Sequence, residues 1–334
     1  MASEAGLETA RKELAWRLAY NFEFLAVAEC FELASHAGAL PPQPLCHEFH
    51  YWITVERGKH HASNEPGTAP PMEFTNRDKL LSLGAVWKPE HIDGLEGLAS
   101  RGVTVTALIY DMIPITHTDF LPSEEMDRFK IYLERMLRSN IRLTTISRSS
   151  RQEIAKYAQN TLGLCKDVAV TPLASSASTD RAKVSAALLK AGLQDREFVF
   201  MAGSIEPRKN QGFLLDIWQA ATSRLVNPPA LVFAGGLAKA AYLQELRQKA
   251  GDIEGVLFFY NVGDEELAWL YENCLFTVFP SEAEGWGLPI SEALDRGKYC
   301  LASDNTSLKE AGEGLVFHAS LQDRQAWKMN CTSC

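Results

Sequence analysis

The sequence lacks the features that mark membrane, secreted and nucleic-acid-binding proteins. None of its apolar runs approaches the ~20 residues that a membrane-spanning helix needs. The first residues are charged and show no signal-peptide pattern, so the seven scattered cysteines indicate reduced thiols. A net charge of −9 argues against a nucleic-acid partner. The sequence therefore predicts a cytoplasmic protein.

Metal-binding and dinucleotide-binding patterns are also missing or incomplete. The stretch "CHEFH" contains His47 and His50, but it is one residue shorter than the zinc motif His-Glu-x-x-His. The tail "CTSC" pairs Cys331 with Cys334 and has no second pair at zinc spacing. No turn of the form Gly-x-Gly-x-x-Gly occurs, which argues against a dinucleotide-dependent enzyme. We therefore predict no metal site.

The sequence does contain two separate stretches in which predicted strands alternate with predicted helices. Residues 1–77 are expected to form a helical and irregular segment, and 78–174 a first, partial α/β domain. A polar linker is expected at 175–194, and the pattern then restarts with five strands in residues 195–334. Such an alternation predicts parallel sheets, and the second half is typical of a doubly wound Rossmann-like domain.

The first strand of the second half ends in "GSIEPRKNQG", which we interpret as an anion site. Gly203 allows a sharp turn, and Arg208 and Lys209 come just before a helix that Asn210 is expected to cap. The N–H groups and the dipole at a helix N-terminus favour negative charge, and arginine and lysine both bind phosphate. From these residues alone, a solvated basic loop is an equally good interpretation.

A second loop-forming stretch, "PSEAEGWGLPISEAL", places Glu284 and Glu292 eight positions apart. Glu284 falls in the loop after a strand, and Glu292 lies one turn inside the helix that begins near Pro289. Gly287 allows a ligand to approach the backbone closely. Ionised carboxylates only accept hydrogen bonds, so the two glutamates suit a hydroxyl-rich ligand beyond the strand ends. Two solvated glutamates near a turn are the alternative.

With these two stretches at two strand ends, the sequence resembles the group 1 glycosyltransferases, family 4 of the GT-B fold. The resemblance covers roughly residues 78–318, and its most specific part is the Glu-x7-Glu motif "EGWGLPISE". Further similar stretches are "LVFAGG", "IYDMIP" and "TTISRSSRQEIAKYA". The resemblance implies an α/β protein of two Rossmann-like domains that face across a cleft. The N-terminal domain and the C-terminal end are expected to be incomplete.

The resemblance also implies a reaction. A sugar would pass from a nucleotide-diphospho-sugar to a saccharide or lipid-linked acceptor, with retention and without a metal or other cofactor. The sequence has no Asp-x-Asp, in agreement with a metal-independent transferase. The usual setting would be cell-envelope polysaccharide synthesis, which adds a peripheral contact with the inner face of the membrane. Nucleic acid is not expected as a partner.

Roles for individual residues follow from their positions in the motifs. The catalytic group would comprise Glu284, on hydroxyls of the donor sugar, with Arg208 and Lys209 on the diphosphate. Donor-binding residues would be Glu292 on the ribose, together with Gly203, Val262, Trp286, Gly287 and Leu288. Tyr110 and Asp111 would lie on the acceptor side, where many relatives have histidine before aspartate.

A second interpretation stays open, that of a truncated, non-catalytic relative that binds a nucleotide or a partner glycosyltransferase. Residues 1–77 show no opening strand with a glycine-rich turn, and Tyr110 replaces the usual histidine. A tyrosine would need a strongly lowered pKa to act as a general base. The tail "LQDRQAWKMNCTSC" is not expected to form the closing helices of the family.

Overall fold

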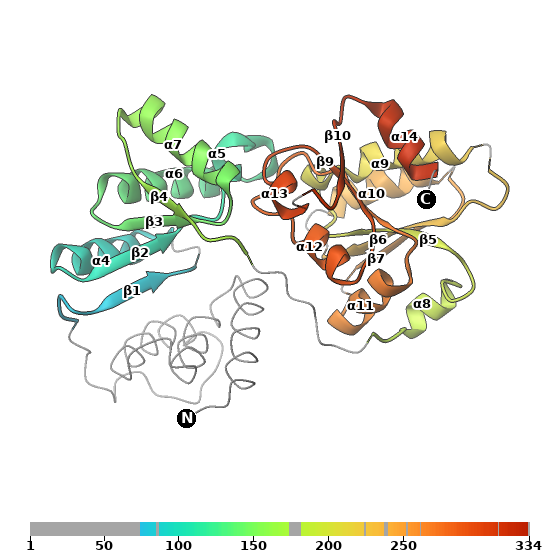
Figure 1. Ribbon diagram of the computed structural model, residues 1–334, viewed down its shortest axis with the longest axis horizontal. Coiled ribbons are helices and arrows are strands. Elements are labelled where there is room, and N and C mark those ends of the chain that lie inside the picture. The colour runs from blue at the N-terminus through green and yellow to red at the C-terminus, as the bar shows by residue number, and fades with distance from the viewer. Residues whose placement is uncertain are drawn as a thin grey trace. The chain divides into compact units, whose positions relative to one another are not determined.

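The computed structural model describes residues 74–84, 87–173, 182–223, 225–236, 240–251, 253–260, 262–312 and 314–332 (Figure 1). The chain forms two compact units that divide between residues 176 and 177. Most of the predicted segment 1–77 and the start of the predicted linker lie outside the described residues. Within the described ranges, no helix has the length and apolar character needed to cross a membrane.

The first unit contains a parallel sheet of four strands in the order β1-β2-β3-β4. These strands are β1 (Lys79–Ser82), β2 (Thr104–Leu108), β3 (Arg142–Thr145) and β4 (Val168–Val170). They are connected by α4 (Pro89–Ser100), α5 (Ile113–Thr116), η1 (Thr118–Phe120), α6 (Ser123–Arg138) and α7 (Arg148–Leu162). Helix α6 contacts both α4 and α7. The alternation predicted from residue 78 is therefore present.

The connecting helices form where local sequence signals place them. Helix α6 buries apolar side chains at three- and four-residue steps, including Phe129, Leu133 and Met136. Helix α7 begins after Ser147, whose hydroxyl accepts a hydrogen bond from the Ser150 N–H group at 3.0 Å. The same helices pack their apolar faces against the inward-facing residues of the sheet, so the unit has a core of its own.

The second unit contains a parallel sheet of six strands in the order β10-β9-β8-β5-β6-β7 (Figure 1). The strands are β5 (Phe198–Ala202), β6 (Ala230–Gly235), β7 (Val256–Tyr260), β8 (Thr277–Phe279), β9 (Cys300–Ser303) and β10 (Phe317–Ala319). The helices are α8 (Ala186–Lys190), η2 (Pro207–Lys209), α9 (Gln211–Thr222), α10 (Ala240–Ala250), α11 (Asp264–Asn273), α12 (Leu288–Asp295), α13 (Leu308–Gly312) and α14 (Arg324–Thr332). This strand order is that of a doubly wound Rossmann sheet.

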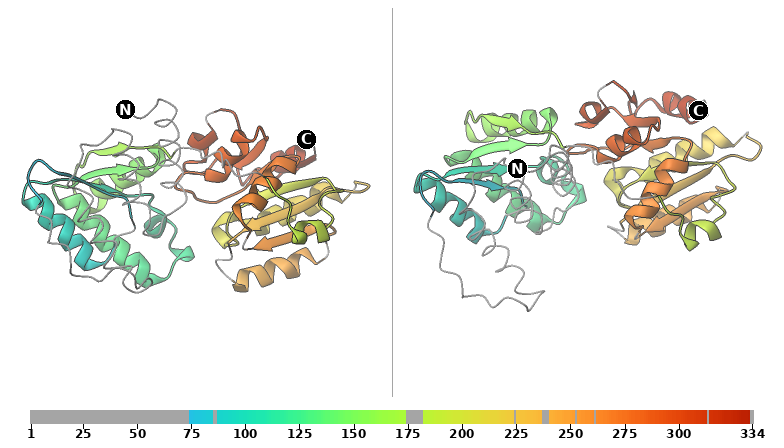
Figure 2. Two further views of the ribbon diagram at one scale, coloured as in Figure 1. Left: turned by 90° about the horizontal axis from the view of Figure 1, so that it is seen from below. Right: turned by 60° about the horizontal axis from the view of Figure 1, so that its bottom comes forward.

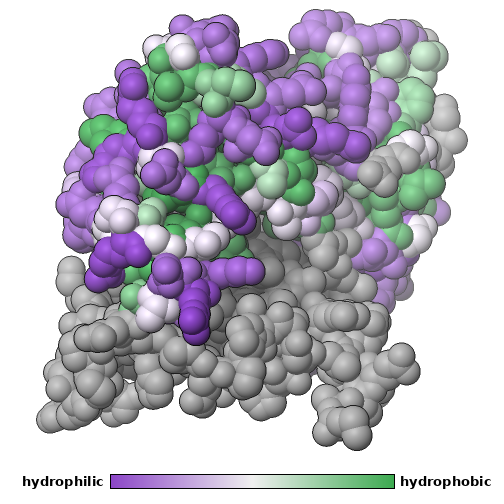
Figure 3. Space-filling view, turned by 60° about the vertical axis from the view of Figure 1, so that its left-hand side comes forward, coloured by the Kyte–Doolittle hydropathy of each residue, from purple (hydrophilic) through white to green (hydrophobic). Residues whose placement is uncertain are grey.

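Strand β5 is apolar throughout because both of its faces are buried. Phe198 and Phe200 belong to one core cluster, with residues of α11 and α12, while Val199 and Met201 belong to another, with residues of α9 and α10. Helices therefore cover both faces of the sheet (Figure 2). Figure 3 shows one face of the molecule, on which hydrophilic residues are interspersed with smaller hydrophobic areas.

The end of the chain differs from the prediction. The sequence predicts five strands in this half and places no further element after them, whereas the structure has the sixth strand β10 and helix α14. Strand β10 has only three residues, and its Phe317 is 40% exposed, so the apolar pattern that marks a strand is hard to recognise in the sequence. Helix α14 is mostly polar but inserts the fully buried Trp327 against Phe213 of α9. A single large side chain anchors the helix where the hydrophobic pattern is weak.

Candidate functional site

The loops after β5 and β8 meet where the strand order of the second sheet reverses. These strands are neighbours in the sheet although two other strands separate them in the sequence. Beyond their carboxyl ends, the N–H group of Glu282 donates to the carbonyl oxygen of Arg208 at 2.9 Å. Such a reversal is where doubly wound sheets bind their ligands, so the two predicted stretches lie at the expected place.

A cluster of buried charges joins the two loops. Lys209 Nζ lies 2.6 Å from Glu284 Oε1, and Arg208 Nη1 lies 2.9 Å from Glu284 Oε2. The side chains of Lys209 and Glu284 are each 10% exposed, and that of Arg208 is 15% exposed. Burial alone would raise the pKa of Glu284, but Lys209 and Arg208 outweigh it, so that pKa lies below its usual value. Glu284 is therefore held ionised between two cations.

Sequence reasoning missed a fourth member of this cluster, Glu206. Its Oε1 accepts hydrogen bonds from Arg208 Nη2 and from the Ser204 hydroxyl, each at 2.8 Å. Arg208 also donates to the carbonyl oxygen of Ala283 at 2.6 Å. The arginine is thus oriented from three sides. A carboxylate two residues before an Arg-Lys pair is the sequence signal that would have identified it.

The backbone around Gly203 explains how Lys209 reaches the cluster. Gly203 has φ +128°, and a Cβ there would lie 3.6 Å from Lys209 Cε. The loop then turns through η2 into α9, with Asn210 in the left-handed conformation at φ +62°. The prediction that the Asn210 side chain caps α9 is wrong, since it makes no capping hydrogen bond. Asparagine is used here because it tolerates the left-handed backbone of the turn.

The loop that carries Glu284 is fastened by the segment after β9. Thr306 Oγ1 accepts from the Glu284 N–H group at 2.9 Å, and the Ser307 hydroxyl lies 2.7 Å from the Glu284 carbonyl oxygen. The same hydroxyl lies 3.0 Å from the carbonyl oxygen of Trp286. Both residues were missed from the sequence. Strand β9 neighbours β8, so the residues after β9 belong to the same edge, and a known strand order would have identified them.

Gly287 closes this loop and starts α12. It has φ +117°, and a Cβ there would lie 2.8 Å from Leu308 Cδ2. The predicted donor-binding residues Trp286 and Leu288 flank it and are half-buried. The indole Nε1 of Trp286 is buried and has no hydrogen-bond partner among the described residues. Val262 lies after β7 and packs against the core cluster that contains α11 and α12.

Glu292 has surroundings different from those of Glu284. It lies one turn inside α12, as predicted, and is 6% exposed. Its Oε2 accepts a hydrogen bond of 2.6 Å from the hydroxyl of Tyr271 in α11. Burial raises the pKa of Glu292 to about 7, against the opposing effect of Arg296. The two glutamates of the motif therefore differ in charge near neutral pH, which the sequence did not predict.

The acceptor-side residues lie in the first unit, after β2. The Tyr110 hydroxyl donates to the carbonyl oxygen of Leu83 at 2.5 Å, and burial raises the pKa of Tyr110. A raised pKa argues against a general-base role for this tyrosine. Asp111 Oδ1 accepts from the Ile113 N–H group at 3.0 Å and so stabilises the start of α5.

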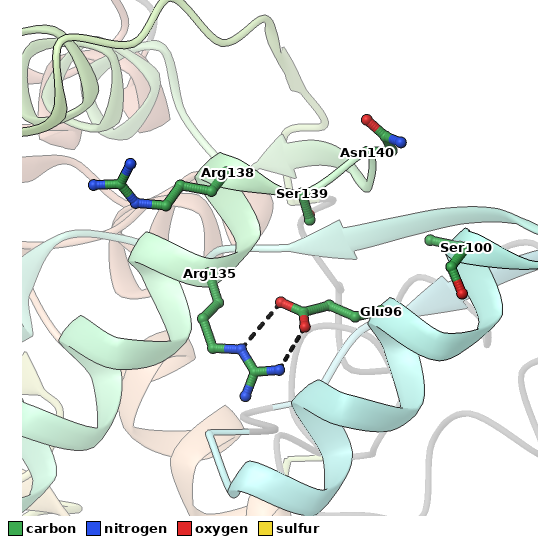
Figure 4. A pocket seen from close by; sticks show the side chains of 7 residues that line it. Glu96, Ser100, Arg135, Arg138, Ser139 and Asn140 are labelled. Atoms are coloured by element: carbon green, nitrogen blue, oxygen red, sulfur yellow. Dashed lines mark hydrogen bonds and ion pairs between the residues drawn. The ribbon is translucent and has the colours of Figure 1, made fainter.

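A pocket of the first unit lies at the opposite edge of its sheet (Figure 4). It opens between the C-terminal ends of α4 and α6, which precede β2 and β3. The guanidinium of Arg135 spans it and donates from Nε to Glu96 Oε1 at 3.0 Å. Ligands of parallel sheets bind at carboxyl ends, so we interpret this pocket as part of the helix packing. Of the residues considered and rejected as metal ligands, Cys331 is buried in α14, and His47, His50 and Cys334 lie outside the described residues.

Comparison with known proteins finds a family model that matches most of the second unit. Residues 189–330 match the family model described as "Glycosyl transferases group 1". The serotype-specific mannosyltransferase WbdA of Escherichia coli is 23% identical over 276 residues, which cover 78% of this chain and 33% of the relative. O-antigen chain mannosyltransferase B of Escherichia coli is 29% identical over 223 residues, or 65% of this chain and 57% of the relative. The chain thus spans about a third of WbdA.

Solved structures support the same fold. Anabaena HepE in complex with UDP-glucose has a TM-score of 0.59 at 14% identity, and the match covers 100% of this chain and 86% of HepE. A trehalose-phosphate synthase of Burkholderia xenovorans, in complex with glucose-6-phosphate, has a TM-score of 0.59 at 12% identity, covering 97% and 78% of the two chains. These likenesses concern the fold, and they confirm the predicted α/β fold of the GT-B type.

Proposed function

We propose, from the match of residues 189–330 to the model of the glycosyl transferases group 1 family, that this chain transfers a sugar from a nucleotide-diphospho-sugar. The acceptor is a saccharide or a lipid-linked saccharide. The observation that carries the proposal is the cluster of Arg208, Lys209 and Glu284 at the reversal point of the sheet. Cations and carboxylate are both needed there, because the donor carries a diphosphate next to a hydroxyl-rich sugar.

The chemistry follows from where charge develops. The bond between the anomeric carbon and the diphosphate oxygen breaks, the acceptor hydroxyl oxygen bonds to that carbon, and the hydroxyl proton passes to the departing diphosphate. Negative charge grows on the departing diphosphate, which Arg208 and Lys209 stabilise from fixed positions in a largely buried site. Glu284 exchanges its ion pairs for hydroxyls of the donor sugar, and Glu292 binds the ribose.

The relatives supply the first donor to test. Two of them are named mannosyltransferases, one acting on the O-antigen chain, so we propose mannose as the sugar and a cell-envelope polysaccharide as the product. We also propose that transfer retains the anomeric configuration and needs no metal, because Arg208 and Lys209 supply the positive charge that a metal would bring. Activity in the presence of EDTA and NMR of the product would test these two points.

Nucleotide binding is the experiment that tests the donor site. Titration calorimetry with UDP, GDP and ADP should show that one of them binds the wild type, and that Glu292→Ala and Lys209→Met weaken it. Glu282→Gln is the matched control, since this side chain is exposed in the same loop and the contact of Glu282 with Arg208 uses the backbone N–H group, which the substitution keeps. Absence of binding by all three nucleotides would refute the proposed function.

A second candidate function is nucleotide binding without turnover. Tyr110 in place of the usual histidine, with its hydroxyl engaged by the Leu83 carbonyl and its pKa raised by burial, favours this candidate. Tight binding of a nucleotide together with no transfer from any nucleotide-mannose donor would support it. Transfer to a mannose-terminated oligosaccharide would exclude it.

A further inference from the structure

We propose that Tyr271 is a positioning residue for the donor nucleotide, which acts by holding the carboxylate of Glu292 in its binding orientation. The inference rests on the proposed function, because Glu292 is assigned there to the ribose. Tyr271 lies on α11 and Glu292 on α12, which neighbour each other in the second unit (Figure 1).

The contact is specific and short. The Tyr271 hydroxyl lies 2.6 Å from Glu292 Oε2 and 3.4 Å from the carbonyl oxygen of Pro289, in the first turn of α12. The hydroxyl has one proton, and the shorter distance to the more basic oxygen assigns that proton to Glu292. Among the described residues, Tyr271 is the only hydrogen-bond partner of the Glu292 carboxylate.

Tyr271 is itself held rigidly. Its side chain is 1% exposed, and its ring packs edge-on against Phe200 of β5 with centroids 5.0 Å apart. The guanidinium of Arg296 lies 5.5 Å from the centroid of the same ring. The hydroxyl therefore has a fixed position relative to β5, the strand that leads into the loop with Arg208 and Lys209. Packing of the tyrosine ring therefore allows the hydroxyl to hold the carboxylate of Glu292 in one orientation.

The hydrogen bond leaves one oxygen of Glu292 for the ligand. With Oε2 engaged by Tyr271, Oε1 becomes the acceptor for ribose hydroxyls. Loss of the hydroxyl would leave Glu292 free to rotate and would remove a donor that favours its ionised form. Both effects weaken ribose binding, while the ring packing of Tyr271 on Phe200 does not depend on the hydroxyl.

Tyr271→Phe tests the inference because it removes only the hydroxyl. Calorimetry with whichever of UDP, GDP and ADP binds the wild type should show affinity reduced about tenfold, the size expected for one hydrogen bond to a charged group. The affinity of the variant should also reach its plateau at higher pH than that of the wild type. Tyr157→Phe is the matched control, since Tyr157 makes a similar 2.8 Å hydrogen bond to Glu134 in the first unit.

A double variant separates positioning from direct contact with the ligand. If Tyr271 acts through Glu292, Tyr271→Phe should cause no further loss in a protein that already carries Glu292→Ala. Additive losses in the double variant, or full affinity in Tyr271→Phe, would overturn the inference and leave the proposed function intact. A wild-type protein that binds none of the three nucleotides would overturn both.

Discussion

Lys209 Nζ lies 2.6 Å from Glu284 Oε1, across a sequence separation of 75 residues. The same ammonium group lies 5.0 Å from the ring centroid of Phe279, at the end of β8. The ion pair therefore connects the loops after two neighbouring strands. Glu284 therefore balances part of the positive charge that the donor diphosphate would contact.

Glu284→Gln should change stability and anion binding in opposite directions. The variant leaves Lys209 buried without its carboxylate, so the free energy of unfolding should fall by about 3–5 kcal/mol. Pyrophosphate no longer competes with Glu284 for the cations, and it should bind roughly tenfold more tightly, or about 1.4 kcal/mol. Sugar transfer should fall, because glutamine is a weaker acceptor for the donor hydroxyls. Urea unfolding, calorimetry and a transfer assay measure the three quantities.

The exposed Glu282 provides the control for this variant, since Glu282→Gln should leave all three quantities unchanged. Weaker pyrophosphate binding in Glu284→Gln would mean that the carboxylate orients the cations rather than competing for them.

The raised pKa of Glu292 predicts a pH-dependent stability. The folded carboxyl has a pKa of about 7, against 4.5 for the ordinary group, so between these values the folded state holds a proton that the unfolded state releases. The free energy of unfolding should therefore decrease as pH rises from about 4.5 to about 7, by roughly 3 kcal/mol, and then level off. Asp295 adds to this effect and Arg296 opposes it. Urea unfolding at pH 5 and pH 8 would measure it.

Glu292→Gln should remove this dependence, because glutamine does not titrate. Glu272→Gln, on the exposed face of α11, should preserve it. An identical pH slope in wild type and Glu292→Gln would show that another group carries the titration.

Gly287→Ala should destabilise the protein through both backbone and packing. Its φ of +117° disfavours any residue with a Cβ, and the new atom would lie 2.8 Å from Leu308 Cδ2. We expect a loss of about 1–3 kcal/mol in thermal unfolding, together with weaker nucleotide binding. Gly97→Ala in α4 is the control: nothing lies within 4 Å of its Cβ, and it should be neutral or stabilising. Equal melting temperatures for the two variants would contradict the prediction.

Ser307→Ala should loosen the loop that holds Glu284. The fully buried hydroxyl serves the carbonyl oxygens of Glu284 and Trp286, and its loss should cost about 1–2 kcal/mol of unfolding free energy. Nucleotide affinity should fall as well, measured by calorimetry. Ser100→Ala removes an exposed hydroxyl from α4 and should change neither quantity. Reduced stability with unchanged affinity would limit Ser307 to a packing role.

Local signals in the sequence were sufficient for much of the site. Apolar residues follow one another in the strands but recur every three or four residues in the helices, so the two kinds of element could be told apart from the sequence. Their alternation predicted the parallel sheets. Glycine and proline marked the turns after β5 and β8, so Arg208, Lys209 and Glu284 could be placed at strand ends before any contact was known. The weakly patterned β10 and α14 were missed, since one buried Trp327 supports a mostly polar helix.

The sequence by itself determined which residues stand at the strand ends, because strand, turn and helix are encoded by neighbouring residues. Only the tertiary structure decided which of them meet. Glu284 pairs with Lys209 because β8 lies beside β5, whereas Glu292 is turned to Tyr271 and burial raises its pKa. Strand order and burial arise from packing over the whole unit, so the different charge states of the two glutamates follow from the fold and not from their spacing.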